Sequence, residues 1–178
     1  MDITVATRPV QPADQKLFCR LWSRLSPDTV YRRFHAPVRA LPEETVRHLV
    51  TVDHDQRDAV VAVVGGEVVG VARYDRPPDD PSTAEIALLV EDAWQGVGLG
   101  RQLLVELTDL AARRGVHTLT ATVQPDNEPV LGLLRRVLPQ STLTPEADVY
   151  TVTSPLDAAP EPVSTAPPRA ALLASATH

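Results

Sequence analysis

Three glycines alternate within the stretch WQGVGLGRQLL, residues 94–104, at positions Gly96, Gly98 and Gly100. Leucines at helical spacing follow them, so these glycines stand where a helix is expected to begin. The first N–H groups of a helix have no internal acceptors, and the helix dipole favours negative charge at that end. Because glycine carries no Cβ atom, a phosphate group can approach such a backbone closely. The stretch therefore predicts a site for a phosphate or pyrophosphate group.

The spacing of the glycines argues against the two commonest nucleotide-binding loops. A Walker A loop ends in Gly-Lys-Ser/Thr, whereas Gly100 is followed by Arg101 and Gln102. A dinucleotide loop has the spacing G-x-G-x-x-G and an acidic residue about 20 positions later, at the end of a second strand. Here the spacing is G-x-G-x-G, and no such acidic residue follows. A different phosphate-containing ligand is therefore expected.

The same stretch fits the pattern Gln/Arg-x-x-Gly-x-Gly/Ala through Gln95, Gly98 and Gly100. It resembles the acetyl-CoA pyrophosphate loop of the GNAT superfamily of N-acetyltransferases, and NEPVLGLLRRV, residues 127–137, resembles the Asn-x-x-Ala-x-x-Leu-Tyr helix of that family. The resemblance covers residues 3–153. It implies an α/β fold of the GNAT type, with a mixed, mostly antiparallel central sheet that splays between two strands and is flanked by helices. It also implies acetyl transfer from acetyl-CoA to an amine, without a metal.

The resemblance further implies which residues hold acetyl-CoA. The backbone of Leu88, Leu89 and Val90 would hold the pantetheine arm and the thioester, and Asn127 would bond the arm. The pyrophosphate would lie on main-chain N–H groups, with a positive charge from Arg101, along Gln95, Gly96, Val97, Gly98, Leu99, Gly100 and Arg101. Some of these residues also suit a purely structural role. Leucine and valine side chains suit a core, Arg101 suits a solvated helix face, and Asn127 suits a helix N-cap.

Acetyl transfer to a lysine needs a general base, because the amine has a pKa of about 10.4 and is almost fully protonated at neutral pH. Glu85 is the candidate, since it stands ten residues before Gln95 on the strand that leads into the glycine loop. The alternative is an exposed charge at the start of a strand. Glu91 and Asp92 are rivals, but they lie at the far end of that strand, where they are better suited to holding the turn.

One position departs from the family pattern. Many GNAT enzymes have a tyrosine seven residues after the helix-capping asparagine, as the acid that protonates the leaving thiolate, whereas this chain has Leu134. Either the thiolate, with a pKa of about 8.5, leaves without assistance, or another group serves. Tyr31 and Tyr74 are the distant alternatives.

Three segments are similar to bacterial protein lysine acetyltransferases of the Pat type: residues 25–35, 49–63 and 84–100. This narrower resemblance implies that the acceptor is a protein lysine, with acetyl-CoA synthetase-like enzymes as candidate acceptors and Glu85 as the base. It also implies a fused or partner regulatory domain. Two alternatives stay open: an acetyltransferase for a small amine such as an amino sugar or polyamine, and a non-catalytic acyl-CoA-binding module.

Turn and capping signals organise residues 1–155 as one mixed α/β domain. Asp14, Ser26 and Asn127 are expected to cap helices. The predicted helices are 14–24, 26–35, 41–52, 98–114 and 127–137, and the predicted strands are 3–10, 58–64, 67–76, 84–91, 116–123 and 148–154. Residues 156–178 are rich in Pro and Ala and predict a flexible tail or linker.

Composition limits the remaining classes of function. A net charge of -6 argues against non-specific nucleic-acid binding. The most apolar run, residues 59–72, carries Gly65-Gly66 and is typical of a β-hairpin, so no membrane association is expected. The single Cys19 excludes an intrachain disulfide framework and a Cys-rich zinc site, and we expect it to be buried. The N-terminus lacks a signal-peptide pattern, and the expected location is the cytoplasm.

Overall fold

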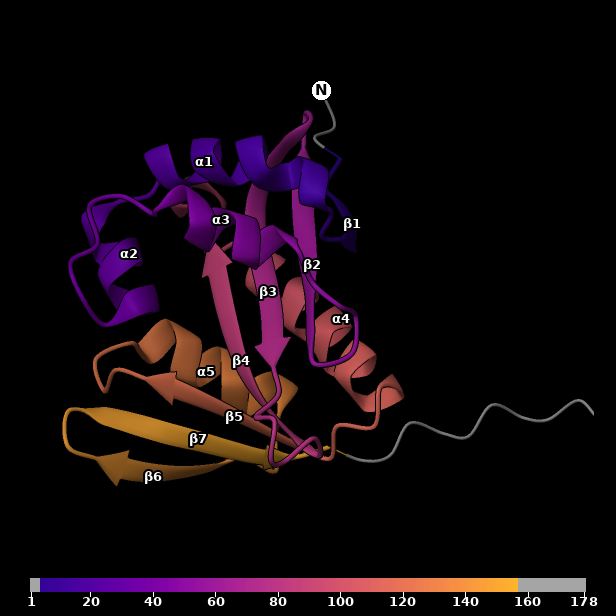
Figure 1. Ribbon diagram of the computed structural model, residues 1–178. Coiled ribbons are helices and arrows are strands. Elements are labelled where there is room, and N and C mark those ends of the chain that lie inside the picture. The colour runs from indigo at the N-terminus through magenta and orange to yellow at the C-terminus, as the bar shows by residue number, and fades with distance from the viewer. Residues whose placement is uncertain (1–3, 157–178) are drawn as a thin grey trace, which may run out of the picture.

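The structure, a computed structural model, describes residues 4–156 and contains one seven-stranded sheet (Figure 1). The strand order is β1-β2-β3-β4-β5-β7-β6, and every neighbouring pair is antiparallel except β4 and β5, which are parallel. The strands are β1 (Ala6–Pro9), β2 (Arg57–Val64), β3 (Glu67–Asp75), β4 (Thr83–Val90), β5 (Thr118–Val123), β6 (Thr142–Glu146) and β7 (Val149–Pro155). The helices are α1 (Gln15–Ser23), α2 (Pro27–Phe34), α3 (Glu43–Val50), α4 (Leu99–Arg113) and α5 (Glu128–Val137), with short 3-10 turns at Pro12–Asp14 and Asp92–Trp94.

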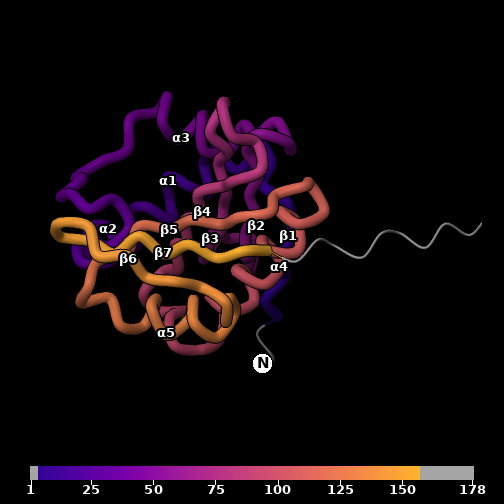
Figure 2. Tube along the Cα trace, turned by 90° about the horizontal axis from the view of Figure 1, so that it is seen from below, coloured from indigo at the N-terminus to yellow at the C-terminus, as the bar shows by residue number. Residues whose placement is uncertain are grey.

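Helices cover both faces of the sheet (Figure 2). Helices α1, α2 and α3 lie on one side, and α4 and α5 lie on the other. The alternation of β2 reflects this arrangement, because successive side chains of a strand point to opposite faces. Val60 and Ala62 belong to the core under α4 and α5, whereas Ala59 and Val61 belong to the core under α1 and α3. The predicted α/β sheet flanked by helices is confirmed.

A glycine in β3 lets helix α4 lie close to the sheet. A Cβ atom at Gly70 would come within 2.9 Å of Leu103 Cδ1, a separation that real Cβ atoms do not show. Leu103 is fully buried and lies near the start of α4. The position of this helix, and of the glycine loop before it, therefore depends on the missing side chain at Gly70.

Every predicted helix and strand is present, but the sequence reasoning missed one strand, β6. Its segment TLTPE contains Pro145, which weakens a strand signal because proline has no N–H to donate. The strand forms at the edge of the sheet, where one side of the backbone needs no partner. The first strand is shorter than predicted, Ala6–Pro9 instead of 3–10, and residues 1–3 lie outside the described part of the chain.

Cys19 and the segment that begins at Leu156 differ from the sequence predictions or reach beyond the described residues. The expected burial of Cys19 is wrong: the thiol is exposed, because α1 turns Phe18 and Leu21 toward the core and Cys19 away from it. The predicted tail begins at Leu156, which packs against the core, and residues 157–178 lie outside the described residues. Within residues 4–156 no helix combines the length and apolarity needed to cross a bilayer.

Asp14 occupies the N-cap position of α1 as expected, but the expected capping hydrogen bond is absent. Instead its two carboxylate oxygens accept hydrogen bonds from the Arg8 guanidinium at 2.7 and 2.8 Å, and one of them accepts from the Gln11 N–H at 2.9 Å. The residue is only 2% exposed. Asp14 therefore ties β1 to the start of α1.

This ion pair predicts a pH-dependent stability. The hydrogen bond from Arg8 holds the pKa of Asp14 below its ordinary value. The pair therefore stabilises the fold above the ordinary carboxyl pKa of about 3.9, and this stability is lost as the pH falls through the lower pKa of the folded state. We expect Asp14→Asn to lower the free energy of unfolding at pH 7 by about 1–3 kcal/mol. Urea denaturation between pH 3 and 7 should show a shallower acid-side decline for the variant, and parallel declines would contradict this account.

Candidate functional site

Strands β4 and β5 are paired along only part of their length. Their parallel register covers three positions, Thr83 with Thr118, Ala84 with Leu119, and Glu85 with Thr120. Beyond Glu85 the two strands diverge, although β4 continues to Val90 and β5 to Val123 (Figure 1). The predicted splay of the sheet is confirmed, and Glu85 stands at its vertex.

A groove of about 550 Å³ lies beside the far end of this opening, between β4, α2, α4 and α5. Most of the predicted cofactor residues line it: Leu88, Leu89, Val90, Gln95, Gly96, Gly98, Gly100, Arg101 and Asn127. Two do not. The Val97 side chain is 68% exposed, and the Leu99 side chain is buried in the core. Any contribution of these two residues must come from their backbone.

The glycine loop presents a row of backbone donors to the groove. Gly96 and Gly98 have φ angles of +74° and +90°, a region that glycine enters without strain. Helix α4 begins directly after Gly98, and the N–H of Gln102 is the first to bond an acceptor, Gly98 O at 3.1 Å. Among residues 4–156, no acceptor serves the N–H groups of residues 96–101. This arrangement suits an anion, as the glycine spacing predicts.

The third glycine of the loop differs from the other two in its backbone conformation. Gly100 lies inside α4 and does not have a positive φ angle. A Cβ atom there would lie 3.4 Å from Leu133 Cδ2 and 3.5 Å from Leu88 Cδ2. These are ordinary van der Waals distances, so the packing of α4 against α5 and β4 does not require a glycine at this position.

Polar side chains fasten the glycine loop to the start of α2. The Gln95 amide donates to Val90 O at 2.9 Å and to Thr29 Oγ1 at 3.1 Å. The Asp92 carboxylate accepts from the Ser26 N–H and hydroxyl at 2.9 and 2.6 Å, and from the Thr29 hydroxyl at 2.8 Å. Ser26 also accepts from the Thr29 N–H at 3.2 Å, which confirms it as the N-cap of α2. Asp92 therefore holds the turn, as expected.

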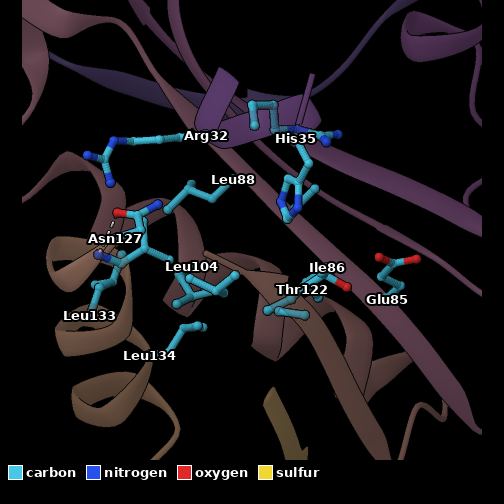
Figure 3. A pocket seen from close by; sticks show the side chains of 15 residues that line it. Arg32, His35, Glu85, Ile86, Leu88, Leu104, Thr122, Asn127, Leu133 and Leu134 are labelled. Carbon is cyan, nitrogen blue, oxygen red and sulfur yellow. Dashed lines mark hydrogen bonds between the residues drawn. The ribbon is translucent and has the colours of Figure 1, made fainter. Parts of the chain in front are cut away.

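A second cavity, of about 250 Å³, adjoins the groove and contains Glu85 (Figure 3). The two cavities share Leu88, Asn127 and Leu133 in their walls, so they are continuous. The Glu85 side chain is exposed and has no hydrogen bond or ion pair within residues 4–156. The candidate base and the candidate cofactor residues are thus brought together by the fold.

Helix α2 brings cationic side chains to this second cavity. Arg32 is engaged by Asp28 at 2.8 Å and lies 3.8 Å from the Asp126 carboxylate. Arg33 lines both cavities and, within the described residues, has no ion pair or hydrogen bond. Burial lowers the pKa of Arg33, and the nearby Arg73 acts in the same direction, whereas Asp75 and Glu85 oppose the change. Of the two arginines, Arg33 is therefore the one without a carboxylate partner in the described part of the chain, and its guanidinium lies over the Phe34 ring, 4.8 Å from the ring centroid.

Helix α5 and the residue before it carry two positions with predicted roles: Asn127, expected to bond the pantetheine arm, and Leu134, where the family pattern has a proton-donating tyrosine. Asn127 Oδ1 accepts from the Val130 N–H at 3.4 Å, so the expected N-cap is confirmed. Leu134 lines the Glu85 cavity, where the family pattern has a tyrosine. Neither candidate tyrosine lines either cavity: Tyr74 is buried and donates to Asp55 O, and Tyr31 is exposed.

Thr122, a polar residue of the cavity, was not identified by the sequence reasoning. Thr122 faces the cavity from β5, and the alternation of residues 118–123 could have identified its side of the strand. His35 enters the cavity from the end of α2 because it adopts a left-handed conformation, with a φ angle of 55°. No pattern in the sequence predicts the left-handed conformation of His35. Residues 4–156 contain no cluster of three or more His, Cys, Asp or Glu side chains able to hold a metal ion.

Comparisons with known proteins agree with this geometry. The family model described as Acetyltransferase (GNAT) family matches residues 18–138. Acetyltransferase Pat of Mycolicibacterium smegmatis is 33% identical over 135 residues, which cover 73% of this chain and 39% of that protein. Acetyltransferase PA5475 of Pseudomonas aeruginosa is 32% identical over 119 residues, 65% of this chain and 63% of that protein. The chain thus spans less than two thirds of either relative.

A solved structure supports the same assignment. The GNAT domain of S. lividans PAT superposes with a TM-score of 0.80 and 27% identity, covering 85% of this chain and 90% of that one. The family model spans more than half of the chain. The matched residues include the glycine loop and strand β4, which lines both cavities. The chain therefore carries an acetyl-CoA-dependent acetyltransferase domain and belongs to the acetyltransferase (GNAT) family.

Proposed function

We propose that this domain transfers the acetyl group of acetyl-CoA to the side-chain amine of a protein lysine, by direct attack in a ternary complex. The observation that carries the proposal is the opening between β4 and β5, with Glu85 at its vertex and the glycine loop at its far end. A thioester in this opening would lie between a carboxylate and a row of backbone donors.

Acetyl-CoA would replace the missing strand partner. Past Glu85, β4 has no β5 neighbour, so the backbone groups of Leu88, Leu89 and Val90 that do not bond β3 can bond the pantetheine arm. The unbonded N–H groups of residues 96–101 would bind the pyrophosphate, and Arg101 would add a positive charge. Asn127 would bond the arm with the part of its amide that does not cap α5.

The reaction would begin with proton removal from the lysine ammonium by Glu85, directly or through a water. The free amine then attacks the thioester carbonyl, and backbone N–H groups stabilise the oxyanion that forms. Collapse of this intermediate breaks the C–S bond and releases the thiolate of coenzyme A, while the nitrogen loses its remaining extra proton to water or to the thiolate to give the neutral amide. With Leu134 in place of a tyrosine, this thiolate, of pKa about 8.5, would leave without a proton donor from α5.

The similarity to Pat-type proteins supports a protein lysine as the acceptor, with acetyl-CoA synthetase-like enzymes as the first candidates. The proposal includes a fused or partner regulatory domain, which the same resemblance implies, and a cytoplasmic location.

Arg33 favours a second candidate function. Its guanidinium has no ion-pair partner among residues 4–156 and faces the cavity that contains Glu85. A small acceptor with both an amine and a carboxylate, such as a free amino acid, could engage Glu85 and Arg33 together. The alternative is therefore a small-amine acetyltransferase.

One experiment separates these functions. The protein is incubated with acetyl-CoA and, in separate reactions, with a purified acetyl-CoA synthetase, an amino sugar, a polyamine and free amino acids. Mass spectrometry of the products is expected to show acetylation of one lysine of the synthetase and no acetylated small amine. Acetylated small amines alone would establish the alternative. Binding of acetyl-CoA without any product would identify a non-catalytic binding module.

A further inference from the structure

The outer strands of the sheet carry an ordered array of threonines, which we call the threonine face. In the register of the sheet, Thr120 pairs with Thr153, and Thr153 pairs with Thr142. The next row joins Thr122, Thr151 and Thr144 in the same way, and Thr118 precedes Thr120 on the same side of β5. The threonine face therefore consists of Thr118, Thr120, Thr122, Thr142, Thr144, Thr151 and Thr153.

No helix of residues 4–156 covers this face. The opposite side of the same strands buries Leu119, Ala121 and Val152 in the core with α5. Figure 2 shows α4 and α5 on that opposite side, and in Figure 1 β5, β7 and β6 lie away from α1 and α3. Helix α2 comes near the face only at Thr122, which lines a cavity together with Arg32 and Arg33. Thr122, Thr142 and Thr144 are exposed, and the other members are partly exposed.

The chemistry of the face suits contact with a protein. Strands β5, β6 and β7 contain one charged residue, Glu146, although charged residues make up 22% of the chain. β-Propensity favours threonine and disfavours aspartate and lysine in strands, but exposed edge strands such as β6 usually carry charged side chains, and these three strands have only Glu146. Few charges must be desolvated when such a surface is covered, and charged residues are likewise depleted at the centre of protein interfaces.

The threonine face is continuous with the candidate catalytic residue. Glu85 pairs with Thr120 across β4 and β5, so one row runs Glu85, Thr120, Thr153, Thr142. Strands lie about 4.8 Å apart, so this row is about 15 Å long. A protein segment resting on the face would reach Glu85 without crossing any helix.

We infer that the threonine face docks the surface segment of an acceptor protein that carries the reactive lysine. This inference rests on the proposed lysine acetyltransferase function. Charge supports the choice of occupant: Glu85 lies at one border, and Glu146 and Asp148 lie at the β6–β7 turn. None of these three carboxylates has an ion-pair partner within residues 4–156, and the three strands contain no lysine or arginine. A lysine-bearing segment complements this border.

The contact is formed by the face and not by the edge of the sheet. Pro145 removes a backbone donor from the edge strand β6, which disfavours the addition of a further strand there. Three strands about 4.8 Å apart and five residues long present on the order of 250 Å². That area is well below a standard stable interface of about 800 Å² per partner, so the complex is transient, as turnover requires.

The test compares a protein acceptor with a small one. Thr151→Lys and Thr144→Lys place a cation on the face, and Thr51→Lys makes the same change at an exposed site after α3, outside the face. The acceptors are a purified acetyl-CoA synthetase and Nα-acetyl-lysine methylamide. We expect both face variants to raise KM for the synthetase by about 10-fold or more, on the scale of losses at interface residues. KM for the small acceptor and Kd for acetyl-CoA should change less than about 2-fold, and Thr51→Lys should match wild type throughout.

The outcomes distinguish the two levels of the proposal. Wild-type protein that acetylates the small acceptor but not the synthetase would reject the lysine acetyltransferase function, and the docking inference with it. Wild type that acetylates the synthetase, with unchanged KM in both face variants, would reject the docking inference alone. Equal losses with both acceptors would also reject it, because the face would then act through the fold of the site. Circular dichroism and thermal melting of each variant identify any failure to fold. If one face variant does not fold, the other still tests the inference.

Discussion

Replacement of Glu85 by glutamine is expected to lower kcat for acetyl transfer by about 100- to 10,000-fold, the usual range for loss of a general base. Glutamine keeps the shape of the side chain but cannot accept the proton of the lysine ammonium. Kd for acetyl-CoA should stay within about 2-fold of wild type, because Glu85 lies at the vertex of the β4–β5 opening and the glycine loop lies at its other end. Thiol release measures the rate, and calorimetry measures the affinity.

The pH dependence of the variant separates a base from a merely structural residue. A lysine amine has a pKa of about 10.4, so the fraction of free amine rises about tenfold per pH unit near neutrality. Transfer by the glutamine variant should rise with pH in the same proportion, since the acceptor then arrives without its proton. The matched control is Asp109→Asn, because Asp109 is an exposed carboxylate on α4 with no hydrogen bond or ion pair within residues 4–156. This control should keep most of the rate. Equal turnover by the Glu85 variant and wild type would remove Glu85 from the mechanism.

Replacement of Gly98 by valine is expected to weaken acetyl-CoA binding by about 10- to 100-fold. Gly98 has a φ angle of +90°, and a β-branched residue is a genuine outlier there. Such strain costs about 1–3 kcal/mol, which corresponds to the expected change in affinity if the loop relaxes and its donors turn away from the groove. The added Cβ atom would meet no protein atom within 4 Å, so crowding within the protein does not contribute. The new side chain would also occupy space needed by the pyrophosphate.

A second glycine supplies the control for this change. Gly66, in the turn between β2 and β3, has a φ angle of +81°, and a Cβ atom there also meets nothing within 4 Å. Gly66→Val therefore imposes a similar backbone strain far from the groove, and it should lower thermal stability without changing Kd for acetyl-CoA. If calorimetry gave the same acetyl-CoA affinity for Gly98→Val and wild type, the N–H groups of residues 96–101 would not be the pyrophosphate site.

The predictable parts of the site are those encoded over short distances. Glycine spacing and the leucine period after it are enough to indicate the start of α4, and Ser26 and Asn127 cap their helices as their sequence neighbours suggest. Gln95 and Glu85 were assigned from their positions on one continuous strand and loop. Each of these features depends on residues a few positions apart, where backbone preferences dominate.

The features that were missed depend on which of several competing partners a residue meets in the fold, even where that partner lies close by in the sequence. The Asp14 side chain makes no capping bond to α1 because Arg8 on the neighbouring strand binds its carboxylate. Strand β6 forms in spite of Pro145 because β7 provides its ladder. The availability of Arg33, unlike that of Arg32, reflects the position of Asp28 and of Asp126 near α5, and not any difference between the two arginines themselves.

The sequence by itself determined the order of the helices and of every strand except β6, and the start of α4, because these follow from local spacing and periodicity, and its resemblance to GNAT acetyltransferases indicated the family. Only the tertiary structure decided where β4 and β5 part, which side chains share the cavity of Glu85, and that an uncovered threonine face borders it. The physical reason is that register and helix packing join residues distant in the chain. Strand register and helix packing depend on how all the helices and strands pack together on the two faces of one sheet.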